Sequence, residues 1–316
     1  EQMAQAPMLG REHVHEIRRL RRGALVAPRL EADVIVSHLT VTWMNLALIT
    51  GLRALNPDRP ILHVEHSYTE GFVASHDVPR QRFATLLRVS YAMFDRVVAV
   101  SGQQGAWLMR RGFVPAERLV TINPSVDLAP FLALTPRLAG VPQVWGLIGR
   151  LDVQKGFDIA IRAFRASAGP DDVLRIVGDG PERASLEALA LGDAHIQFTG
   201  WATVPAEAMA ACDAVLMPSR WEAFGLVALE AQAAGRLLVV SGMDGLADHQ
   251  RHGAIGVGRN SVEAWAAVLE RLRHGVDGER ILRGRQRARR AALDFEAAWL
   301  ALLEEAAAPS TVANAA

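Results

Sequence analysis

The chain has 316 residues, of which 50% are hydrophobic and 22% are charged, a composition typical of globular proteins that bury substantial cores. The formal net charge is zero, so nothing global indicates a nucleic-acid partner. The single cysteine, Cys212, excludes an intrachain disulfide and favours a reducing compartment. At about 150 residues per domain, the length predicts two domains.

In the first half of the chain, short β-branched runs alternate with longer helical patterns, which predicts βαβ units and a parallel sheet. We expect strands at 33–37, 60–64, 96–100 and 118–122. We expect helices at 11–30, 42–55, 80–93 and 103–111. The stretch 123–142 lacks periodicity and is rich in proline, so it is predicted to contain an interdomain linker.

The same alternation restarts after this stretch. Strands are expected at 144–148, 173–177, 195–198, 214–217 and 237–240. Helices are expected at 156–167, 181–191, 204–211, 225–234, 261–274 and 279–306. The predicted organisation is a first domain at 1–125, a linker at 126–142 and a second domain at 143–295. Ligands of such open parallel sheets bind beyond the carboxyl ends of the strands.

Two loops that follow strands of the second half have a composition suited to phosphate. The loop at 149–156 carries Arg150, which can fork onto two phosphate oxygens, and Lys155, a compact charge. A solvated pair of cations is the alternative. In the next loop, Gly178 and Gly180 permit tight turns and the close approach of a ligand, although a plain strand–helix turn has the same composition.

The segment 218–235 carries the most informative pattern. A helix is expected to begin near Gly225, and the backbone N–H groups at its start suit an anion. Glu222 precedes this helix, and Glu230 lies about 7–8 Å inside it at 1.5 Å per residue. That separation suits a diphosphate at the helix tip, a sugar at one carboxylate and a ribose at the other. The alternative is that Glu230 forms the exposed edge of an amphipathic helix.

Together these motifs resemble the donor domain of family 4 glycosyltransferases (glycosyl transferases group 1), a retaining family with the GT-B fold. The family pattern reads G-R-x-x-x-x-K-G, then G-x-G-P, then P-S-x-x-E-x-F-G-x-x-x-x-E-A-x-A-x-G. In this chain it matches 149–156, 178–181 and 218–235, and the resemblance covers about residues 94–300. It implies an α/β GT-B fold: two Rossmann-like domains with a central cleft, and the C-terminal helix at 296–308 packing back on the first domain.

The resemblance also implies which residues act. The residues that bind the nucleotide-sugar donor would be Arg150, Lys155, Gly178, Gly180, Phe224, Gly225, Leu226 and Glu230. The catalytic set would be His66, Glu222, Arg150 and Lys155. In this scheme Glu222 contacts the transferred sugar and Glu230 contacts the ribose. His66 ends the motif H-V-E-H, which lies where the family has a strand ending in T-x-H-G.

The activity implied by the resemblance is transfer of a sugar from a nucleoside diphosphate sugar to an acceptor hydroxyl, with retention of configuration. We expect a polyprenyl-linked, lipid or saccharide acceptor, in bacterial-type cell-surface polysaccharide or glycolipid synthesis. No Asp-x-Asp is present, and the pairs His13/His15, His63/His66 and His249/His252 lack further ligands, so neither a metal nor another cofactor is expected. If the leaving phosphate takes the acceptor proton, no protein base is needed.

Three features depart from the family pattern. Residues 1–32 carry no glycine-rich loop, so the first domain is expected to be incomplete and the chain to transfer sugar poorly unless it is extended upstream. Ala223 follows Glu222 in place of glycine, and the loop 241–248 replaces the usual G-x-P-E. The alternative function is therefore a non-catalytic nucleotide-sugar-binding or partner protein. A GT-B epimerase is disfavoured, because no acid–base set for the sugar C2 is present.

Arginines crowd both ends of the chain, at Arg18, Arg19, Arg21, Arg22 and Arg29, and at Arg280, Arg283, Arg285, Arg287, Arg289 and Arg290. Ordinary solvated helix faces would explain both clusters. The other interpretation is that they seat a cytoplasmic protein on the inner face of an anionic membrane, near a lipid-linked acceptor.

Overall fold

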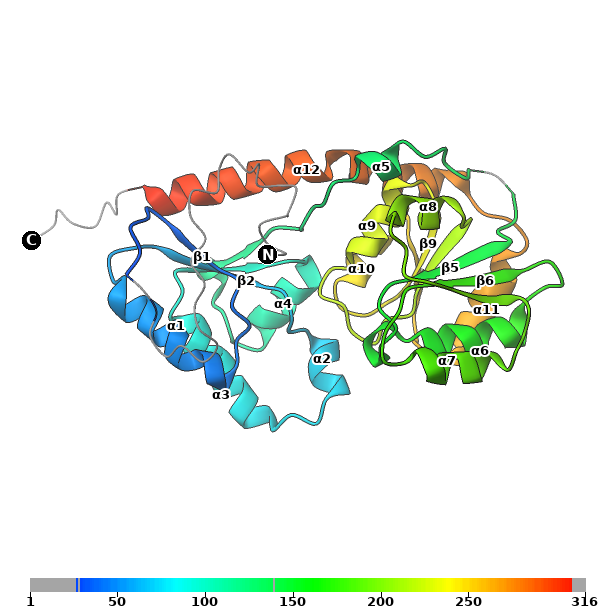
Figure 1. Cartoon of the computed structure of the whole chain (residues 1–316). Helices are drawn as coiled ribbons and strands as arrows, with labels where there is room; N and C mark the ends of the chain where they lie inside the picture. The colour runs from blue at the N-terminus through cyan, green and yellow to red at the C-terminus, as the bar shows by residue number, and fades with distance from the viewer. Residues whose placement is uncertain (1–26, 28, 139, 309–316) are drawn as a thin grey trace, which may run out of the picture. The chain divides into compact units, whose positions relative to one another are not determined.

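The computed structural model describes residues 27, 29–138 and 140–308, which form two compact units (Figure 1). The first unit contains the described residues up to Tyr68, His76–Val126 and those from Leu293 onward. The second contains Thr69–Ser75 and Asp127–Ala292. Most of the helix expected at 11–30, the arginines at 18–22 and the His13/His15 pair lie outside the described residues.

The described part of the first unit holds a parallel sheet in the order β1-β2-β3-β4. Its strands are β1 (Ile35–Ser37), β2 (Ile61–Glu65), β3 (Arg96–Ala99) and β4 (Leu119–Thr121). Its helices are α1 (Trp43–Leu55), α3 (Arg80–Ala92) and α4 (Gly102–Arg110), with a 3-10 turn at Ala116–Arg118. Side-chain caps begin two of these helices, because the hydroxyls of Thr42 and Ser101 accept N–H groups three residues ahead.

The second unit contains a six-stranded parallel sheet in the order β10-β9-β8-β5-β6-β7. Its strands are β5 (Val144–Ile148), β6 (Val173–Val177), β7 (Ile196–Gly200), β8 (Ala214–Met217), β9 (Leu237–Ser241) and β10 (Ile255–Val257). Chain order therefore runs outward from β5 in one direction and from β8 in the other, as in a Rossmann sheet, and the strand order reverses at the β5/β8 pair.

Helices cover both faces of this sheet (Figure 1). On one face lie α6 (Phe157–Ser167), α7 (Arg183–Ala190) and α11 (Val262–Leu272). On the other lie α8 (Pro205–Ala210), α9 (Leu226–Ala233) and α10 (Leu246–Gln250). The last described helix is α12 (Gly278–Ala307), which has 30 residues, and its residues from Leu293 onward belong to the first unit. Both sheets are parallel α/β, as predicted.

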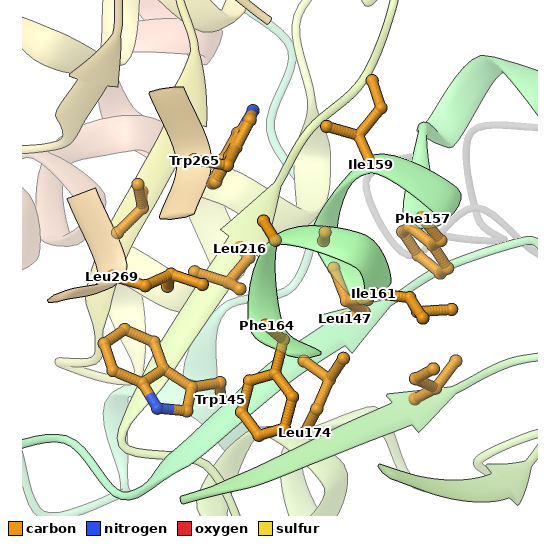
Figure 2. Packing of buried hydrophobic residues seen from close by; sticks show 14 of the residues in the cluster. Trp145, Leu147, Phe157, Ile159, Ile161, Phe164, Leu174, Leu216, Trp265 and Leu269 are labelled. Carbon is orange, nitrogen blue, oxygen red and sulfur yellow. The ribbon is translucent and has the colours of Figure 1, made fainter. Parts of the chain in front are cut away.

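The main core of the second unit lies where α6 and α11 meet the sheet. Figure 2 shows Phe164 of α6 and Trp265 of α11 packed among strand side chains such as Trp145, Leu147 and Leu174. Each of these five side chains is almost completely buried. The sheet is therefore held rigidly on the face that these helices cover, and the loops beyond its strand ends stand on a fixed support.

Besides two 3-10 turns, at Ala116–Arg118 and Val153–Lys155, four short elements were not predicted from sequence: α2 (Glu70–Ser75), α5 (Ala129–Leu132), α10 and β10. Each has six residues or fewer, too short for a clear periodicity. Tertiary contacts hold them instead. α5 falls in the predicted linker, yet Phe131 is buried and the Arg285 guanidinium donates to the carbonyls of Leu132 and Leu134 at 2.5 and 2.9 Å.

Replacing Phe164 by alanine should destabilise the second unit by about 3–5 kcal/mol, because the site cannot collapse around the cavity that is left. Leu293→Ala, at an exposed position of α12, is the control and should change stability little. Denaturant unfolding followed by tryptophan fluorescence measures both. An equal effect of the two changes would contradict the assignment of the core.

Candidate functional site

Two of the three segments predicted to contact the donor follow β5 and β8, the neighbouring strands at which the order of the sheet reverses. We call residues 149–156 the β5 loop and residues 218–225 the β8 loop. The Arg220 N–H donates to the Gln154 carbonyl at 2.8 Å and so joins the two loops. Gly156, with φ of +65°, lets the β5 loop approach the first carbonyl of the β8 loop, where a Cβ would clash. The loops therefore form one continuous surface.

An ion pair between Lys155 and Glu222 spans this surface. Lys155 Nζ lies 2.5 Å from Glu222 Oε2, and the two side chains are only 18% and 14% exposed. Removing either partner would leave a largely buried charge unpaired, which is costly. An ammonium group has three N–H donors, so Lys155 can contact Glu222 and still bind an anion. Among the 34 lysines and arginines of the chain, Lys155 is the single lysine.

Arg150, which was predicted to bind phosphate together with Lys155, is held differently. Its guanidinium pairs with Asp152, which is mostly buried, while the Arg150 side chain itself is 66% exposed. Asp152 also accepts the backbone N–H of Lys155 at 3.3 Å. The same carboxylate therefore orders the backbone of Lys155 and the guanidinium of Arg150. Much of the Arg150 guanidinium thus remains open to a ligand.

Arg220, also in the β8 loop, is engaged inside the protein. It forms a two-pronged ion pair with Asp158 at 2.9 and 2.8 Å. Burial alone would raise the pKa of Asp158, but these hydrogen bonds and the charge of Arg220 outweigh it and lower that pKa. This pair holds the β8 loop against the start of α6, and it leaves Arg150 and Lys155 as the cations suited to a ligand.

Gly178 and Gly180 allow the backbone of the β5 loop to pack closely against the loop that follows β6. A Cβ at Gly178 would clash with the Gly149 carbonyl, and one at Gly180 would clash with the backbone of Leu151. Their N–H groups are already bonded, that of Gly178 to the Gly200 carbonyl at 2.8 Å and that of Gly180 to its neighbour's carboxylate. The structure therefore shows a packing role for both glycines, and their contact with a nucleotide stays a prediction.

The β8 loop delivers the chain into α9 through a left-handed residue. Gly225 has φ of +90°, and a Cβ there would come within 2.7 Å of Leu246. The Ala228 N–H donates to the Gly225 carbonyl at 3.0 Å, whereas the N–H groups of Leu226 and Val227 precede the first residue for which a helix supplies an acceptor. Such a helix start binds anions. It belongs to the same loop as Glu222, as the sequence predicted.

A buried histidine fixes the turn at Phe224. His249 is fully buried, its Nε2 lies 3.0 Å from the Phe224 carbonyl, and its ring packs on the Phe224 ring. Burial lowers the pKa of His249 to about 3, so the ring is neutral and donates one N–H to this carbonyl. The Arg287 guanidinium covers the Phe224 ring at 5.4 Å. The backbone before Gly225 is thus held from two sides.

Glu230 is a carboxylate without a partner in the part of the chain that the structure describes. Among the described residues it forms no ion pair or side-chain hydrogen bond, although it lies one turn inside α9 and is partly buried. Burial raises the pKa of Glu230 to about 7. The sequence alternative, the exposed edge of an amphipathic helix, does not fit this burial. An uncompensated carboxylate at such a position is typical of a binding site.

Asp244 was missed in the sequence analysis. It follows β9 with φ of +45°, a conformation that Asp adopts more readily than most residues. Its carboxylate accepts the Thr69 hydroxyl at 2.6 Å, the Gly71 N–H at 3.0 Å and the Glu222 N–H at 3.3 Å. Burial raises its pKa. Asp244 therefore fixes the backbone of Glu222 and holds α2 on the second unit.

The remaining predicted residue, His66, belongs to the first unit, where it lies just beyond β2 and pairs with His38 at 2.8 Å. Within the described residues, no group of three or more His, Cys, Asp or Glu could hold a metal ion. His249, one of the two residues of the His249/His252 pair, bonds the Phe224 carbonyl instead.

Two family models match this chain. One, described as Glycosyl transferases group 1, matches residues 142–274, and the other, Glycosyltransferase Family 4, matches residues 4–130. The chain belongs to the family 4 glycosyltransferases. The first match includes the β5 loop, the β8 loop and α9, so the motifs that bring Lys155 and Glu222 together are part of the family pattern.

Curated relatives agree with this assignment. A GDP-mannose-dependent alpha-(1-6)-phosphatidylinositol dimannoside mannosyltransferase of Mycobacterium tuberculosis is 36% identical over 195 residues, covering 56% of this chain and 50% of the relative. A D-inositol 3-phosphate glycosyltransferase of Thermobispora bispora is 32% identical over 284 residues, covering 80% and 65%. The chain thus spans between half and two thirds of the length of these relatives.

Solved structures show the same fold. The Anabaena protein Alr3699/HepE in complex with UDP has a TM-score of 0.68 at 18% identity, covering 85% of this chain and 79% of its own. Sucrose-phosphate synthase from Thermosynechococcus elongatus has a TM-score of 0.68 at 23% identity, covering 86% and 74%. The family 4 fold of this chain is accordingly GT-B, built from two Rossmann-like units.

Replacing Glu230 by glutamine should stabilise the protein at high pH. Its folded-state pKa, about 7, lies above the ordinary 4.5, so the wild-type protein loses stability as the pH rises through that interval and the glutamine variant does not. We expect an advantage of about 1–3 kcal/mol near pH 8 that vanishes below about pH 4.5. Thermal unfolding at both pH values measures it. A constant difference across pH would contradict the assigned pKa.

Proposed function

We propose that this family 4 protein transfers a sugar from a nucleoside diphosphate sugar to an acceptor hydroxyl with retention of configuration. The observation that carries the proposal is the Lys155–Glu222 ion pair, which joins the β5 and β8 loops beside the free N-terminus of α9. A cation, a carboxylate and a helix start are the groups needed by a diphosphate attached to a polyhydroxylated sugar.

In this proposal the diphosphate lies against Lys155, Arg150 and the start of α9. Negative charge gathers on it as the glycosidic bond breaks, and fixed donors that already point at that position stabilise it without reorganisation. Lys155 is held by Glu222 and Arg150 by Asp152, so both cations are oriented before the donor arrives. This arrangement stabilises the departing group more than it stabilises the intact donor.

The two carboxylates would serve different parts of the donor. Glu222 is paired with a lysine and keeps lone pairs for sugar hydroxyls, a binding role that fits a front-face reaction better than nucleophilic attack. The departing phosphate would accept the proton of the acceptor hydroxyl as the new bond forms, so retention needs no protein base. Glu230, which has no side-chain partner within the described part of the chain, would accept the hydroxyls of the ribose, and these contacts would lower its raised pKa.

The acceptor is proposed as a polyprenyl-linked, lipid or saccharide hydroxyl, in synthesis of a cell-surface glycolipid or polysaccharide. The named substrates of the relatives include a phosphatidylinositol mannoside and an inositol phosphate, which support this class. None of the described helices combines the length and apolarity of a membrane span. We further propose that the protein works at the cytoplasmic face of a membrane. Arg285 and Arg287 would take no part, because they bond within the second unit.

Replacing Lys155 by alanine should weaken the binding of both UDP and GDP by about 10- to 100-fold, since one charge-assisted phosphate contact is worth about 1.5–3 kcal/mol. Lys155→Arg, which keeps the charge but changes its geometry, should fall between alanine and wild type. The control is Arg162→Ala at an exposed position of α6. Calorimetry measures the affinities, and thermal unfolding checks the fold. Unchanged affinity of a folded Lys155→Ala protein would overturn the phosphate role.

Sugar transfer should also be independent of divalent metal, since Lys155, Arg150 and the α9 N–H groups supply the positive charge. Turnover of a nucleotide sugar should persist after dialysis against EDTA. Loss of turnover that Mg²⁺ or Mn²⁺ restores would contradict this. Binding of nucleotide without turnover of any donor, by a protein that folds fully, would instead favour the non-catalytic alternative.

A further inference from the structure

A pair of histidines stands at the carboxyl edge of the first unit's sheet. The strands β1 and β2 are parallel neighbours (Figure 1). His38 is the residue after β1 and His66 the residue after β2, so both residues lie at the same edge of the sheet. His38 Nδ1 lies 2.8 Å from His66 Nε2, and the ring planes differ by 20°. Both residues are exposed to solvent. This pair is therefore accessible and has a defined geometry.

The backbone that carries His66 is rigid. The buried Glu65 carboxylate accepts the N–H groups of Ser67 and Tyr68 at 2.7 and 3.0 Å on one oxygen, and the Tyr91 hydroxyl at 2.7 Å on the other. Burial alone would raise the pKa of Glu65, but its contacts with His63 and these donors outweigh burial and lower it. An ionised carboxylate thus fixes the turn on both sides of His66.

A hydrogen bond between two imidazole rings restricts which ring nitrogens can carry a hydrogen. Partial burial, followed by the influence of neighbouring histidines, lowers the pKa of His38, and burial likewise lowers that of His66. The other titratable groups that act on the pair are His63 and Glu65, both in β2. The pair is therefore neutral near pH 7, and one of the two bonded nitrogens carries a hydrogen while the other accepts it.

This bond also decides the state of the two outer nitrogens, His38 Nε2 and His66 Nδ1, which take no part in it. If His38 Nδ1 carries the hydrogen, His66 Nδ1 must carry one too, and His38 Nε2 is an acceptor. If His66 Nε2 carries it, the roles of the outer nitrogens are exchanged. In both cases the pair offers one donor and one acceptor. Neither outer nitrogen has a partner among the described residues. A hydroxyl group is itself both donor and acceptor, and so it matches the pair in either state.

We propose that His38 is a positioning residue for His66, and that the hydrogen-bonded pair forms a binding element for a sugar hydroxyl. The identity of the ligand rests on the proposed function, because transfer needs hydroxyls to be oriented. The coupling between the two rings does not rest on it. His38 holds the His66 ring and links its tautomer to its own, so that a hydroxyl meets a donor and an acceptor at fixed places.

The coupling can be tested without turnover. In protein labelled with ¹⁵N-histidine, long-range proton–nitrogen spectra report the tautomer and the pKa of each ring. In His38→Ala, the pKa of His66 should rise and its tautomer should become a mixture. His38→Asn places an amide near the former Nδ1 and should keep one tautomer. His274→Ala, at an exposed position of the second unit, should leave His66 unchanged. An unchanged His66 in His38→Ala would overturn the proposal.

The ligand class is tested by transfer kinetics. His38→Ala should lower kcat by about 10- to 100-fold, the order of effect expected for a misplaced contact, with donor KM nearly unchanged. His38→Asn should restore most of the rate. A changed His66 tautomer with wild-type kcat would overturn the binding role. If wild-type protein neither binds nucleotide nor transfers sugar, the proposed function fails, and the spectra alone decide whether His38 positions His66.

Discussion

The Lys155–Glu222 ion pair is the interaction on which the rest of the second unit's chemistry depends. Two opposite charges with less than a fifth of each side chain exposed are stable only together, so the loops after β5 and β8 must keep one relative position. The order of the sheet makes this possible, because β5 and β8 are neighbours although 65 residues separate the end of one from the start of the other. The same pair presents a cation and a carboxylate to a ligand. One contact thus stabilises the loops and defines the site.

Around this pair, the structure supports positions that would be unfavourable on their own. Gly225 and Asp244 have positive φ, and Glu230 is a partly buried carboxylate with no side-chain partner among residues 27, 29–138 and 140–308. Neighbouring groups hold the first two: His249 bonds the carbonyl before Gly225, and three donors surround Asp244. Strained and unsatisfied groups gather at binding sites because a ligand supplies the missing contacts. Their concentration around α9 is therefore consistent with a site prepared for a charged, hydroxyl-rich ligand.

The functional residues differ in how much of their role the sequence reveals. Lys155 is the single lysine of a chain that otherwise uses arginine. This marks a position where the compact ammonium group of lysine is preferred over the planar guanidinium of arginine. His38 lies three residues beyond the start of a short strand and pairs with a histidine 28 residues away. Asp244 stands in a loop that departs from the family pattern. Neither a partner at that distance nor a left-handed conformation can be derived from local composition.

The sequence by itself determined the fold class and the placement of the longer elements. Strands 144–148, 173–177 and 214–217 were predicted at their observed limits, because buried parallel strands are short, apolar and bounded by turns. It also placed Glu222 and Gly225 at a helix start. Only the tertiary structure decided which charges meet: Arg220 bonds Asp158, Lys155 bonds Glu222, and Glu230 forms an ion pair with none of the described residues. Pairing between loops depends on which strands are neighbours and on backbone conformation, and both arise from packing over the whole sheet, beyond the reach of local pattern.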